Sequence, residues 1–572
     1  MVAGLRGPPA HRTAGHNPTT PMADASPPTQ PGRKDPILAH PVAFVCVVAL
    51  LWLFAGLIGH DPWKPEEAQY FGVAYEMFQT GDFVVPTLAG EPYVRNPPLS
   101  PIVATLVAHA LVPVLPFHDA ARLSSGLFMA LTLLLAAATA RELFGAGRSW
   151  LAPLALLGSV GVLLPAHFLV PEIPQLAGSA LALYGFALGL RRPLPGGLAL
   201  GTGVGMAFLA KGFLGPTCLV ATALALPLVS AHWRSRRYLA VLAAAVVAAL
   251  PWLLVWPALL GARAPEALNQ WLWIENVGRL TGEDPLWPPD KPGFYLALLP
   301  WFAFPSLPLA AWAVWAQRRK LGEARMVLPL VFTAAFLVVL SAFGTPRDGY
   351  ALPLLVPLAI LAGVGLLQLS RSTSHAFWWF AMLFPTFMVL MGWFEWFALE
   401  IGIPAARQRH WLRLQPGYQP HVDLFVPVAA LLITALWVWL LWRMRRSPER
   451  PLMAWGAGVA VIWSIASLMF TDYVNAEKSY RQVITAMARE LPPGHDCVSS
   501  YALGDPQRAM LHYFAGIRTW RESVPGRSRN CQVLIVQGAR ANMYVPGPEW
   551  VQIWEGARAG EKRELFRLYK RA

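Results

Sequence analysis

Long apolar runs, separated by short polar segments, dominate the first 470 residues of this 572-residue chain. Pro41–Gly59 and Leu239–Leu260 are typical runs, and each is long enough to cross the hydrocarbon core of a bilayer, which takes about 20 residues of α-helix. Inside lipid, each backbone N–H and C=O must be satisfied within its own segment, so such runs are expected to be helices. The pattern therefore predicts an α-helical polytopic membrane protein with its membrane domain at 37–470.

Short clusters of basic residues lie between these runs: Arg191–Arg192, Arg234 with Arg236 and Arg237, Arg318–Lys320, and Arg443 with Arg445 and Arg446. The positive-inside rule places such clusters in the cytoplasm. The first span, 40–59, then runs outward, residues 60–98 form an external loop, and the last span leaves the C-terminal segment outside. Further spans are predicted at about 196–213, 214–230, 239–260, 292–316, 326–343, 350–369, 376–397, 423–442 and 452–470.

The segment 99–190 holds four apolar runs, near 99–117, 121–143, 150–164 and 175–190. An odd number of spans must connect the external loop to the basic cluster at Arg191–Arg192. We therefore expect that the 99–117 or the 150–164 run fails to cross, or that two runs merge, which gives about 13 transmembrane helices in all.

The composition changes this picture little. Hydrophobic residues make up 55% of the chain and charged residues 14%, whereas soluble domains carry about 25% charged residues. The formal net charge of +14 belongs to clusters between spans and not to a basic soluble domain, so no nucleic-acid partner is expected. Residues 1–36, rich in Pro, Ala, Thr and Gly, are predicted to be a disordered cytoplasmic tail.

The final segment, 471–572, is predicted to be a small α/β domain on the outer side of the membrane. Strands are expected at Cys497–Tyr501 and Val533–Val536, a helix at Gln507–Phe514, and a last strand that begins at Trp550.

The four cysteines form two pairs of different character. Cys46 and Cys218 lie in apolar runs and are expected to be unreactive packing residues. Cys497 and Cys531 lie in the terminal domain and can form a disulfide if that domain is extracytoplasmic.

Glycines recur within one apolar run. The segment Gly201–Gly205 resembles a dinucleotide motif, but no strand precedes it, so that interpretation fails. Gly197, Gly201 and Gly205 are four residues apart, a spacing typical of helices that pack closely in membranes.

The first external loop, 60–98, concentrates polar side chains. Glu66 and Glu67 follow Pro65 at an expected helix start, where acids interact favourably with the helix dipole. The functional alternative is a general base, or a carboxylate that orients a sugar, at the membrane face. Lys211 lies near the outward end of an apolar run, where an ionisable side chain is either functional or reaches to the interface.

Short motifs in a fixed order cover most of residues 40–370: Trp63-Lys64-Pro65-Glu66-Glu67 with Gly81-Asp82, Ala210-Lys211-Gly212-Phe213-Leu214, Trp271-Leu272-Trp273-Ile274-Glu275-Asn276 before Gly278-Arg279-Leu280, Lys291-Pro292, Trp301, Tyr350-Ala351-Leu352-Pro353, and Pro357-Leu358-Ala359. In this order they resemble the integral-membrane glycosyltransferases of the GT-C class. The resemblance is strongest to the lipid A aminoarabinose transferases and the related protein O-mannosyltransferases.

The resemblance implies an enzyme that transfers a sugar, with inversion, from an undecaprenyl phosphate carrier. The acceptor, which is lipid A, another glycan or a protein, would lie on the outer face of the bacterial inner membrane. Glu66 falls at the family's essential first-loop acid and Glu172 near its second acid, both usually Asp. Lys211 matches the lysine that contacts the carrier phosphate, where a fixed cation stabilises the charge that grows as the glycosidic bond breaks. No cofactor is implied, because the lipid-linked sugar is a substrate.

Three further residues are candidates for binding substrate or the carrier phosphate. Glu67 and Tyr350 belong to the matched motifs. Arg347 lies just before Tyr350 at an outward membrane face, and its alternative role is that of an ordinary interface anchor.

The chain departs from the family in its first loop. The family motif often reads Tyr-Phe-Glu-Lys-Pro, whereas this chain has Tyr93-Val94-Arg95-Asn96-Pro97, and the family's Glu-His pair is Glu275-Asn276. Some aminoarabinose transferases bind a structural metal with that loop Glu and that His, so no metal is predicted here. Arg95 is expected to supply the charge of the missing lysine. The alternatives are a flippase that moves a lipid-linked sugar without chemistry, and an inactive family member that only binds the carrier.

Overall fold

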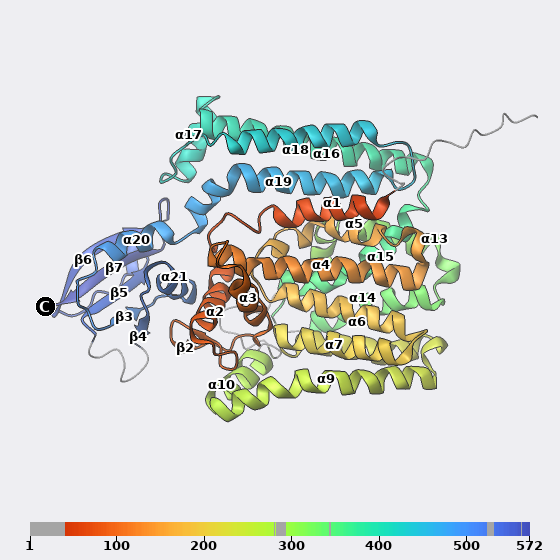
Figure 1. The fold of residues 1–572 in the computed structure, drawn as a ribbon, viewed down its shortest axis with the longest axis horizontal. Helices are drawn as coiled ribbons and strands as arrows, with labels where there is room; N and C mark the ends of the chain where they lie inside the picture. The colour runs from red at the N-terminus through yellow and green to blue at the C-terminus, as the bar shows by residue number, and fades with distance from the viewer. Residues whose placement is uncertain (1–39, 279–280, 282–292, 343–344, 523–530, 562) are drawn as a thin grey trace, which may run out of the picture.

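The computed structural model describes residues 40–278, 281, 293–342, 345–522, 531–561 and 563–572. The predicted tail 1–36 lies outside these ranges, as do Arg279, Leu280 and the Lys291-Pro292 motif. Apolar helices form a bundle, and a small domain of strands and helices lies against one end of it (Figure 1). The α-helical fold with a C-terminal α/β domain is therefore confirmed.

Within the described ranges, eight helical segments are long and apolar enough to cross a membrane, or ten if two bent pairs each count as one span. The predicted count of about 13 spans is not confirmed. Each span predicted from residue 196 onward nevertheless coincides with a helix or with a bent pair. The helices of the bundle are α1 (Pro41–Phe54), α4 (Phe117–Phe144), α5 (Leu151–Leu157), α6 (Glu172–Gly189), α7 (Pro193–Lys211), α8 (Leu214–Val229), α9 (Arg236–Arg263), α12 (Phe294–Phe302), α13 (Ser306–Ala316), α14 (Ala324–Ala342), α15 (Leu355–Leu366), α16 (Arg371–Trp396), α18 (Phe425–Arg443) and α19 (Arg450–Lys478).

Short elements connect these helices: α10 (Pro265–Asn269), the π-helix η5 (Gln270–Gly278), the 3-10 helix η7 (Asp348–Leu354) and α17 (Ala405–Leu414). Among them, η7 runs directly into α15 and forms with it the apolar segment Asp348–Leu366.

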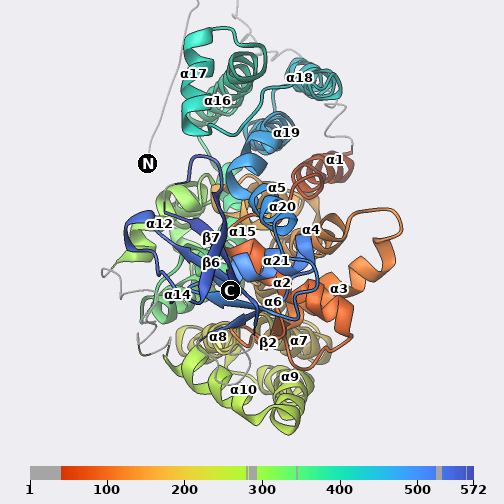
Figure 2. The ribbon, with the colours of Figure 1, turned by 90° about the vertical axis from the view of Figure 1, so that its left-hand side faces the viewer.

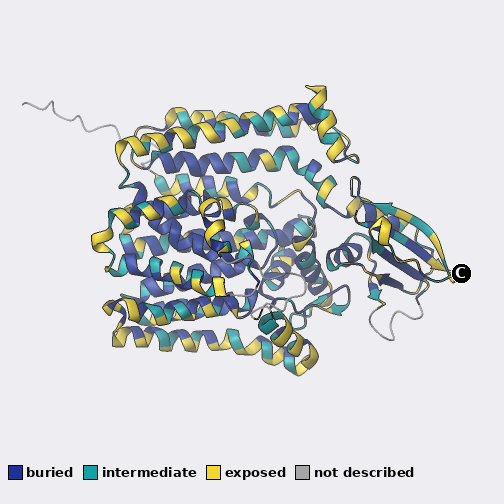
Figure 3. Ribbon diagram, turned by 180° about the vertical axis from the view of Figure 1, so that it is seen from behind, coloured by how far each residue is buried: buried dark blue, intermediate teal, exposed yellow. Residues whose placement is uncertain are grey.

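Burial separates central from peripheral helices. In each helical segment we compared the 18 consecutive residues that are most apolar. Of these, 89% are buried in Asp348–Leu366 and 72% in α19, but only 22% in α9 and 17% in α18. The outer helices therefore carry many exposed residues (Figure 3). Large apolar residues are among them, as in helices that contact lipid.

The glycine spacing of α7 serves close helix packing, as predicted. A Cβ on Gly201 would lie 2.1 Å from the carbonyl oxygen of Ala245 in α9, and a Cβ on Gly197 or Gly205 would lie 2.5 Å or 2.2 Å from atoms of α9. Gly203 packs in the same way against α6. The three backbones therefore approach closely, which fixes the neighbouring ends of α6 and α7.

The predicted external loop, 60–98, folds into α2 (Glu66–Thr80) and a short hairpin of β1 (Thr87–Leu88) and β2 (Glu91–Pro92), and α3 (Leu99–Leu111) follows it. The helix α2 ends at Gly81, which adopts the left-handed conformation that favours glycine. The helix α3 packs beside α2 across the end of the bundle next to the terminal domain (Figures 1 and 2). Of the two runs expected not to cross, 99–117 thus lies across the end of the bundle, and 150–164 lies in a helix pair that is bent by 63°.

The terminal domain has a five-stranded sheet in the order β4-β3-β5-β7-β6, with β3 parallel to both of its neighbours and β7 antiparallel to both of its own. The predicted strands, the helix and the strand start at Trp550 are confirmed, whereas α20, β4 and β7 were not predicted. The elements are α20 (Arg481–Arg489), β3 (Val498–Tyr501), α21 (Asp505–Ala515), β4 (Thr519–Arg521), β5 (Val533–Gly538), β6 (Trp550–Ala557) and β7 (Leu565–Arg571).

The terminal domain and the first loop share one hydrophobic core. This core joins Phe71 of α2 and Phe117 of α4 to Met510 of α21 and Phe566 of β7. The first loop is therefore packed between the bundle and the terminal domain.

Cys497 and Cys531 form a disulfide with their Cα atoms 4.9 Å apart, so the predicted pairing is confirmed. Cys218 is buried, as expected. The packing role predicted for Cys46 is wrong, because this residue lies on the exposed side of α1.

Candidate active site

Four of the predicted site residues lie at helix ends. Glu66 and Glu172 are the first residues of α2 and α6, Lys211 is the last residue of α7, and Arg347 immediately precedes η7. Helix dipoles favour acids at N-termini and cations at C-termini. The local structure therefore stabilises the charges of both acids and of the lysine.

Lys211 and Glu172, 39 residues apart in sequence, form a buried ion pair. The ammonium also lies 5.0 Å from the centre of the Tyr350 ring. A Cβ on Gly349 would lie 2.8 Å from Cγ of Glu172, so a larger residue there would displace the acid. An ammonium has three donors, and within the described ranges Glu172 is its one hydrogen-bond acceptor.

Glu66 approaches this pair from the first loop. Its Oε1 lies 3.7 Å from Nη1 of Arg347, and its side chain is 52% exposed whereas that of Arg347 is 15% exposed. The surrounding protein raises the pKa of Glu66 and the charge of Glu172 adds to the rise, while Lys211 and Arg347 oppose it. Glu66, Glu172, Lys211 and Arg347 thus form one charged cluster.

Arg95 has partners of its own beside the charged cluster. It hydrogen-bonds to Tyr93 and interacts electrostatically with Tyr70 and Glu275. Burial would lower the pKa of the guanidinium, but these neighbours raise it above its usual value. The buried Tyr70 also interacts with both acids of the charged cluster, so it connects Arg95 to the rest of the site.

Glu67 points away from the charged cluster. Its Oε1 accepts a hydrogen bond of 2.7 Å from Nε of Arg122, and the two side chains are 2% and 1% exposed. Asp119 lies 3.2 Å from the same guanidinium, and the backbone N–H of Trp63 donates to Glu67. Glu67 therefore stabilises the fold of the first loop and is not part of the charged cluster.

Asn276, at the family's histidine position, is engaged by protein backbone. Its Oδ1 accepts from the N–H of Phe213 at 3.2 Å, and its Nδ2 donates to the carbonyl oxygen of Trp271 at 2.8 Å. A Cβ on Gly212 would lie 2.1 Å from this Oδ1. Asn276 therefore fastens η5 to the end of α7, next to Lys211. No group of three or more potential metal ligands gathers in the described part of the chain, and the lack of a metal stays a prediction.

A cavity of about 610 Å³ lies on another side of Glu66. Apolar side chains from α19 and from the segment before α6 form most of its wall, among them Phe168, Trp463 and Phe470. Lys64 and Lys478 also line it. Glu66 therefore belongs to the charged cluster and also lines a cavity whose apolar wall suits a hydrocarbon chain.

Sequence reasoning did not identify Arg122, Tyr70 or Gly349 as residues of this region. Arg122 carried a usable signal, because an arginine in an apolar helix requires a partner. Gly349 carried none, because its importance comes from Glu172, 177 residues earlier in the sequence. Tyr70 carried none either, because its neighbours Arg95 and Glu172 are distant in sequence.

The family of dolichyl-phosphate-mannose-protein mannosyltransferases matches residues 96–256. An undecaprenyl phosphate-alpha-4-amino-4-deoxy-L-arabinose arabinosyl transferase of Pseudomonas aeruginosa (strain UCBPP-PA14) is 33% identical over 343 residues, which are 56% of this chain and 58% of that relative. The chain thus spans less than two thirds of that relative's length. The enzyme of the same name from Pseudomonas paraeruginosa (strain DSM 24068 / PA7) is 30% identical over 447 residues, 73% of each chain.

The crystal structure of ArnT from Cupriavidus metallidurans bound to undecaprenyl phosphate has the same fold. It superimposes with a TM-score of 0.71 at 20% identity, and the match covers 92% of this chain and 98% of that one. The long match to the P. paraeruginosa relative and this common fold agree with the ordered motifs. The chain therefore belongs to the family of undecaprenyl phosphate-aminoarabinose arabinosyl transferases, integral-membrane glycosyltransferases of the GT-C class.

Proposed function

We propose that this protein transfers a sugar from an undecaprenyl phosphate carrier to an acceptor on the outer face of the bacterial inner membrane. The observation that carries the proposal is the charged cluster. Four separate segments of the chain bring two acids and two cations together at the end of the bundle where the first loop lies.

The cations suit a lipid phosphate as leaving group. As the glycosidic bond breaks, negative charge grows on the phosphate oxygen, and a cation already in place stabilises that transition state more than the ground state. Glu172 holds the Lys211 ammonium in a fixed place, and the remaining two donors of the ammonium are available to the phosphate. Arg347, set deeper than Glu66, supplies a second cation.

Glu66 suits the activation of an acceptor hydroxyl. A carboxylate whose pKa is raised accepts a proton more readily than an ordinary one, and its half-exposed position leaves it accessible to an incoming acceptor. If the acceptor is itself a phosphate, no base is needed, and Glu66 positions the sugar.

The relatives support the choice of carrier. The names of the relatives give 4-amino-4-deoxy-L-arabinose as their sugar and undecaprenyl phosphate as its carrier, and we propose that carrier, and lipid A or another envelope glycan or protein as acceptor, for this chain. The apolar cavity beside Glu66 supports a substrate with a hydrocarbon chain. The proposal needs no cofactor, and it places the first loop and the terminal domain in the periplasm and the N-terminus in the cytoplasm.

Mass spectrometry of the polyprenyl-phosphate pool tests the proposal. A glycosylated carrier should accumulate in a deletion strain, disappear when the wild-type gene returns, and persist with Glu66→Gln. Glu323→Gln, which changes a half-exposed glutamate before α14, is the control and should clear the carrier. An identical pool in all strains would contradict the proposal.

Turnover by the purified protein in detergent separates transfer from transport. A flippase requires two compartments, whereas a transferase converts a glycosylated carrier and an acceptor in one solution. Release of free undecaprenyl phosphate together with a glycosylated acceptor is the expected result.

A further inference from the structure

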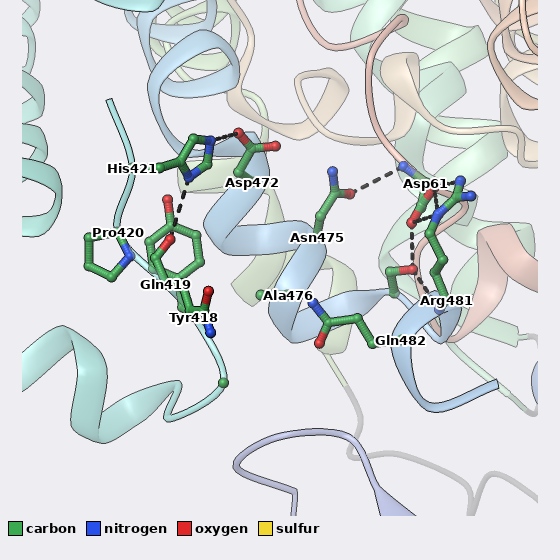
Figure 4. A pocket seen from close by; sticks show the side chains of 12 residues that line it. Asp61, Tyr418, Gln419, Pro420, His421, Asp472, Asn475, Ala476, Arg481 and Gln482 are labelled. Atoms are coloured by element: carbon green, nitrogen blue, oxygen red, sulfur yellow. Dashed lines mark hydrogen bonds and ion pairs between the residues drawn. The ribbon is translucent and has the colours of Figure 1, made fainter. Parts of the chain in front are cut away.

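Two sets of contacts, here called anchors, connect the segment before Glu66 to later parts of the chain: the junction of α19 with α20, and the terminal domain. The first anchor is Asp61, whose carboxylate accepts hydrogen bonds from the guanidinium of Arg481 and, at 2.7 Å, from Oγ of Ser479 (Figure 4). The side chain of Asn475 accepts from the backbone N–H of Asp61 at 3.2 Å and from Nε1 of Trp63 at 2.8 Å. These partners belong to the end of α19 and the start of α20, where the bundle passes into the terminal domain.

The second anchor is Lys64, two residues before Glu66. Its Nζ lies 3.3 Å from Oε2 of Glu561 and 3.5 Å from Oε2 of Glu564, both on the loop between β6 and β7. All three side chains are more than three-quarters buried. The backbone N–H of Lys64 also donates to the carbonyl oxygen of Lys478.

A buried arginine organises the acids that receive Lys64. Arg558, whose side chain is 4% exposed, contacts Glu561 at 3.1 Å and Glu564 at 2.6 Å. It also donates to the carbonyl oxygen of Glu477 at the end of α19. The two acids are thus held in place by the terminal domain, and Lys64 binds to a prepared site.

The terminal domain also packs along the body of α2. A Cβ on Gly72 would lie 2.4 Å from Cβ of Ala509, so α2 and α21 touch closely. Arg508 of α21, 1% exposed, binds Glu91 of the β1–β2 hairpin at 2.8 Å. Contacts from the terminal domain therefore hold the loop both before and after Glu66.

We propose that the terminal domain is a positioning element of the transferase, which holds the Glu66 carboxylate in the charged cluster through Lys64. The proposal rests on the proposed function. Lys64 touches no reacting atom and acts through the backbone that leads to Glu66. A displacement of about 1 Å in a reacting group can cost about 10²-fold in rate, so loss of this anchor should lower kcat while donor binding at Lys211 and Arg347 persists.

Two variants at Lys64 test this inference in the full-length protein, in detergent, with glycosylated undecaprenyl phosphate as donor. Lys64→Met removes the charge and keeps most of the side-chain volume, and it should lower kcat at least about tenfold with donor KM within about threefold of wild type. Lys64→Arg keeps the ion pair and should restore most of kcat. Arg540→Met, which breaks an exposed pair with Glu555 elsewhere in the same domain, should change neither constant.

Hydrogen–deuterium exchange supplies a readout independent of turnover. Peptides that cover residues 60–70 should exchange faster in Lys64→Met than in wild type, and less so in Glu561→Gln, which leaves the contact with Glu564 in place. The double variant should add little to Lys64→Met, because that change already removes both contacts. Exchange in β5 should stay unchanged, which shows that the terminal domain is still folded.

Unchanged exchange over 60–70, or wild-type kcat in Lys64→Met, would overturn the inference. Failure of the proposed function looks different, because wild-type protein would then consume no donor at all. In that case the exchange measurement alone decides whether the terminal domain holds the loop.

Discussion

Glu66 and Glu67 are adjacent in sequence and in the first turn of α2, yet they belong to different parts of the molecule. Glu66 is half exposed and meets Arg347 across 3.7 Å. Glu67 is 2% exposed and is held by Arg122, at 2.7 Å, and by backbone donors. Successive residues on a helix point about 100° apart, so one carboxylate faces the site and the other faces the core.

The comparison shows how the protein separates chemistry from support. Burial of Glu67 favours its protonated form, but the charge of Arg122, together with hydrogen bonds, lowers its pKa below the usual value and keeps it ionised. The surroundings of Glu66 raise its pKa instead. The pKa values of two adjacent glutamates are thus shifted in opposite directions. The lowered pKa suits Glu67 as a fixed structural anion, and the raised pKa suits Glu66 as a proton acceptor.

The largest expected effect is that of Glu66→Gln on turnover. The amide keeps the size of the side chain but cannot accept a proton, so kcat should fall by about 10²–10⁴-fold. Thermal unfolding in detergent should stay at the wild-type temperature, because Glu66 is half exposed and its ion pair with Arg347 spans 3.7 Å, so the pair adds little stability. Wild-type kcat in this variant would remove Glu66 from the mechanism.

Arg122→Met should destabilise the fold by about 3–5 kcal/mol, since it leaves the buried carboxylate of Glu67 without its cation. Chemical denaturation in detergent measures the loss. The double variant with Glu67→Gln should recover part of it and not all, because the buried side chain of residue 67 is then neutral while Asp119 still lacks its contact with Arg122. Equal stability of Arg122→Met and wild type would show that the pair contributes nothing.

Loss of the Lys211 cation should cost about 10²–10³-fold in kcat, the range seen when one group that stabilises a developing anion is removed. The clean variant combines Lys211→Met with Glu172→Gln, so that no buried carboxylate loses its partner. Glu172→Gln alone is the matched control and should lose less activity. If the double variant and the control have equal kcat, the cation is not part of transition-state stabilisation.

The smallest expected effect concerns pH. A base must be deprotonated, so kcat/KM should fall as pH drops through the raised pKa of Glu66. Arg347 opposes this rise in pKa. Arg347→Gln should therefore move the acid limb upward by roughly half a pH unit to one unit, since Glu66 is half exposed and solvent screens the pair. If the acid side of the kcat/KM profile moves to lower pH or stays in place, Arg347 does not lower the pKa of Glu66.

Much of the fold followed from the sequence because its signals are local. Apolar length predicted the spans after residue 196, and alternation with turn residues predicted β3, β5 and the start of β6. The strand β7 (Leu565–Arg571) was missed because it carries two lysine or arginine residues near its end and pairs with β5 and β6 across the sheet. The packing role of Cys46 was misjudged because an apolar run does not reveal which face meets protein.

The sequence by itself determined a membrane helix bundle, a terminal α/β domain and the residue types of the site, because hydrophobic length, alternation and ordered motifs are written along the chain. It left the pairing of Cys497 with Cys531 conditional, and the structure shows the bond. Only the tertiary structure decided that Glu66 and not Glu67 joins Lys211, that η7 passes within contact of Glu172, and that Lys64 is held by acids nearly 500 residues later. Those facts depend on helix rotation and on contacts between distant segments, and no local pattern encodes either.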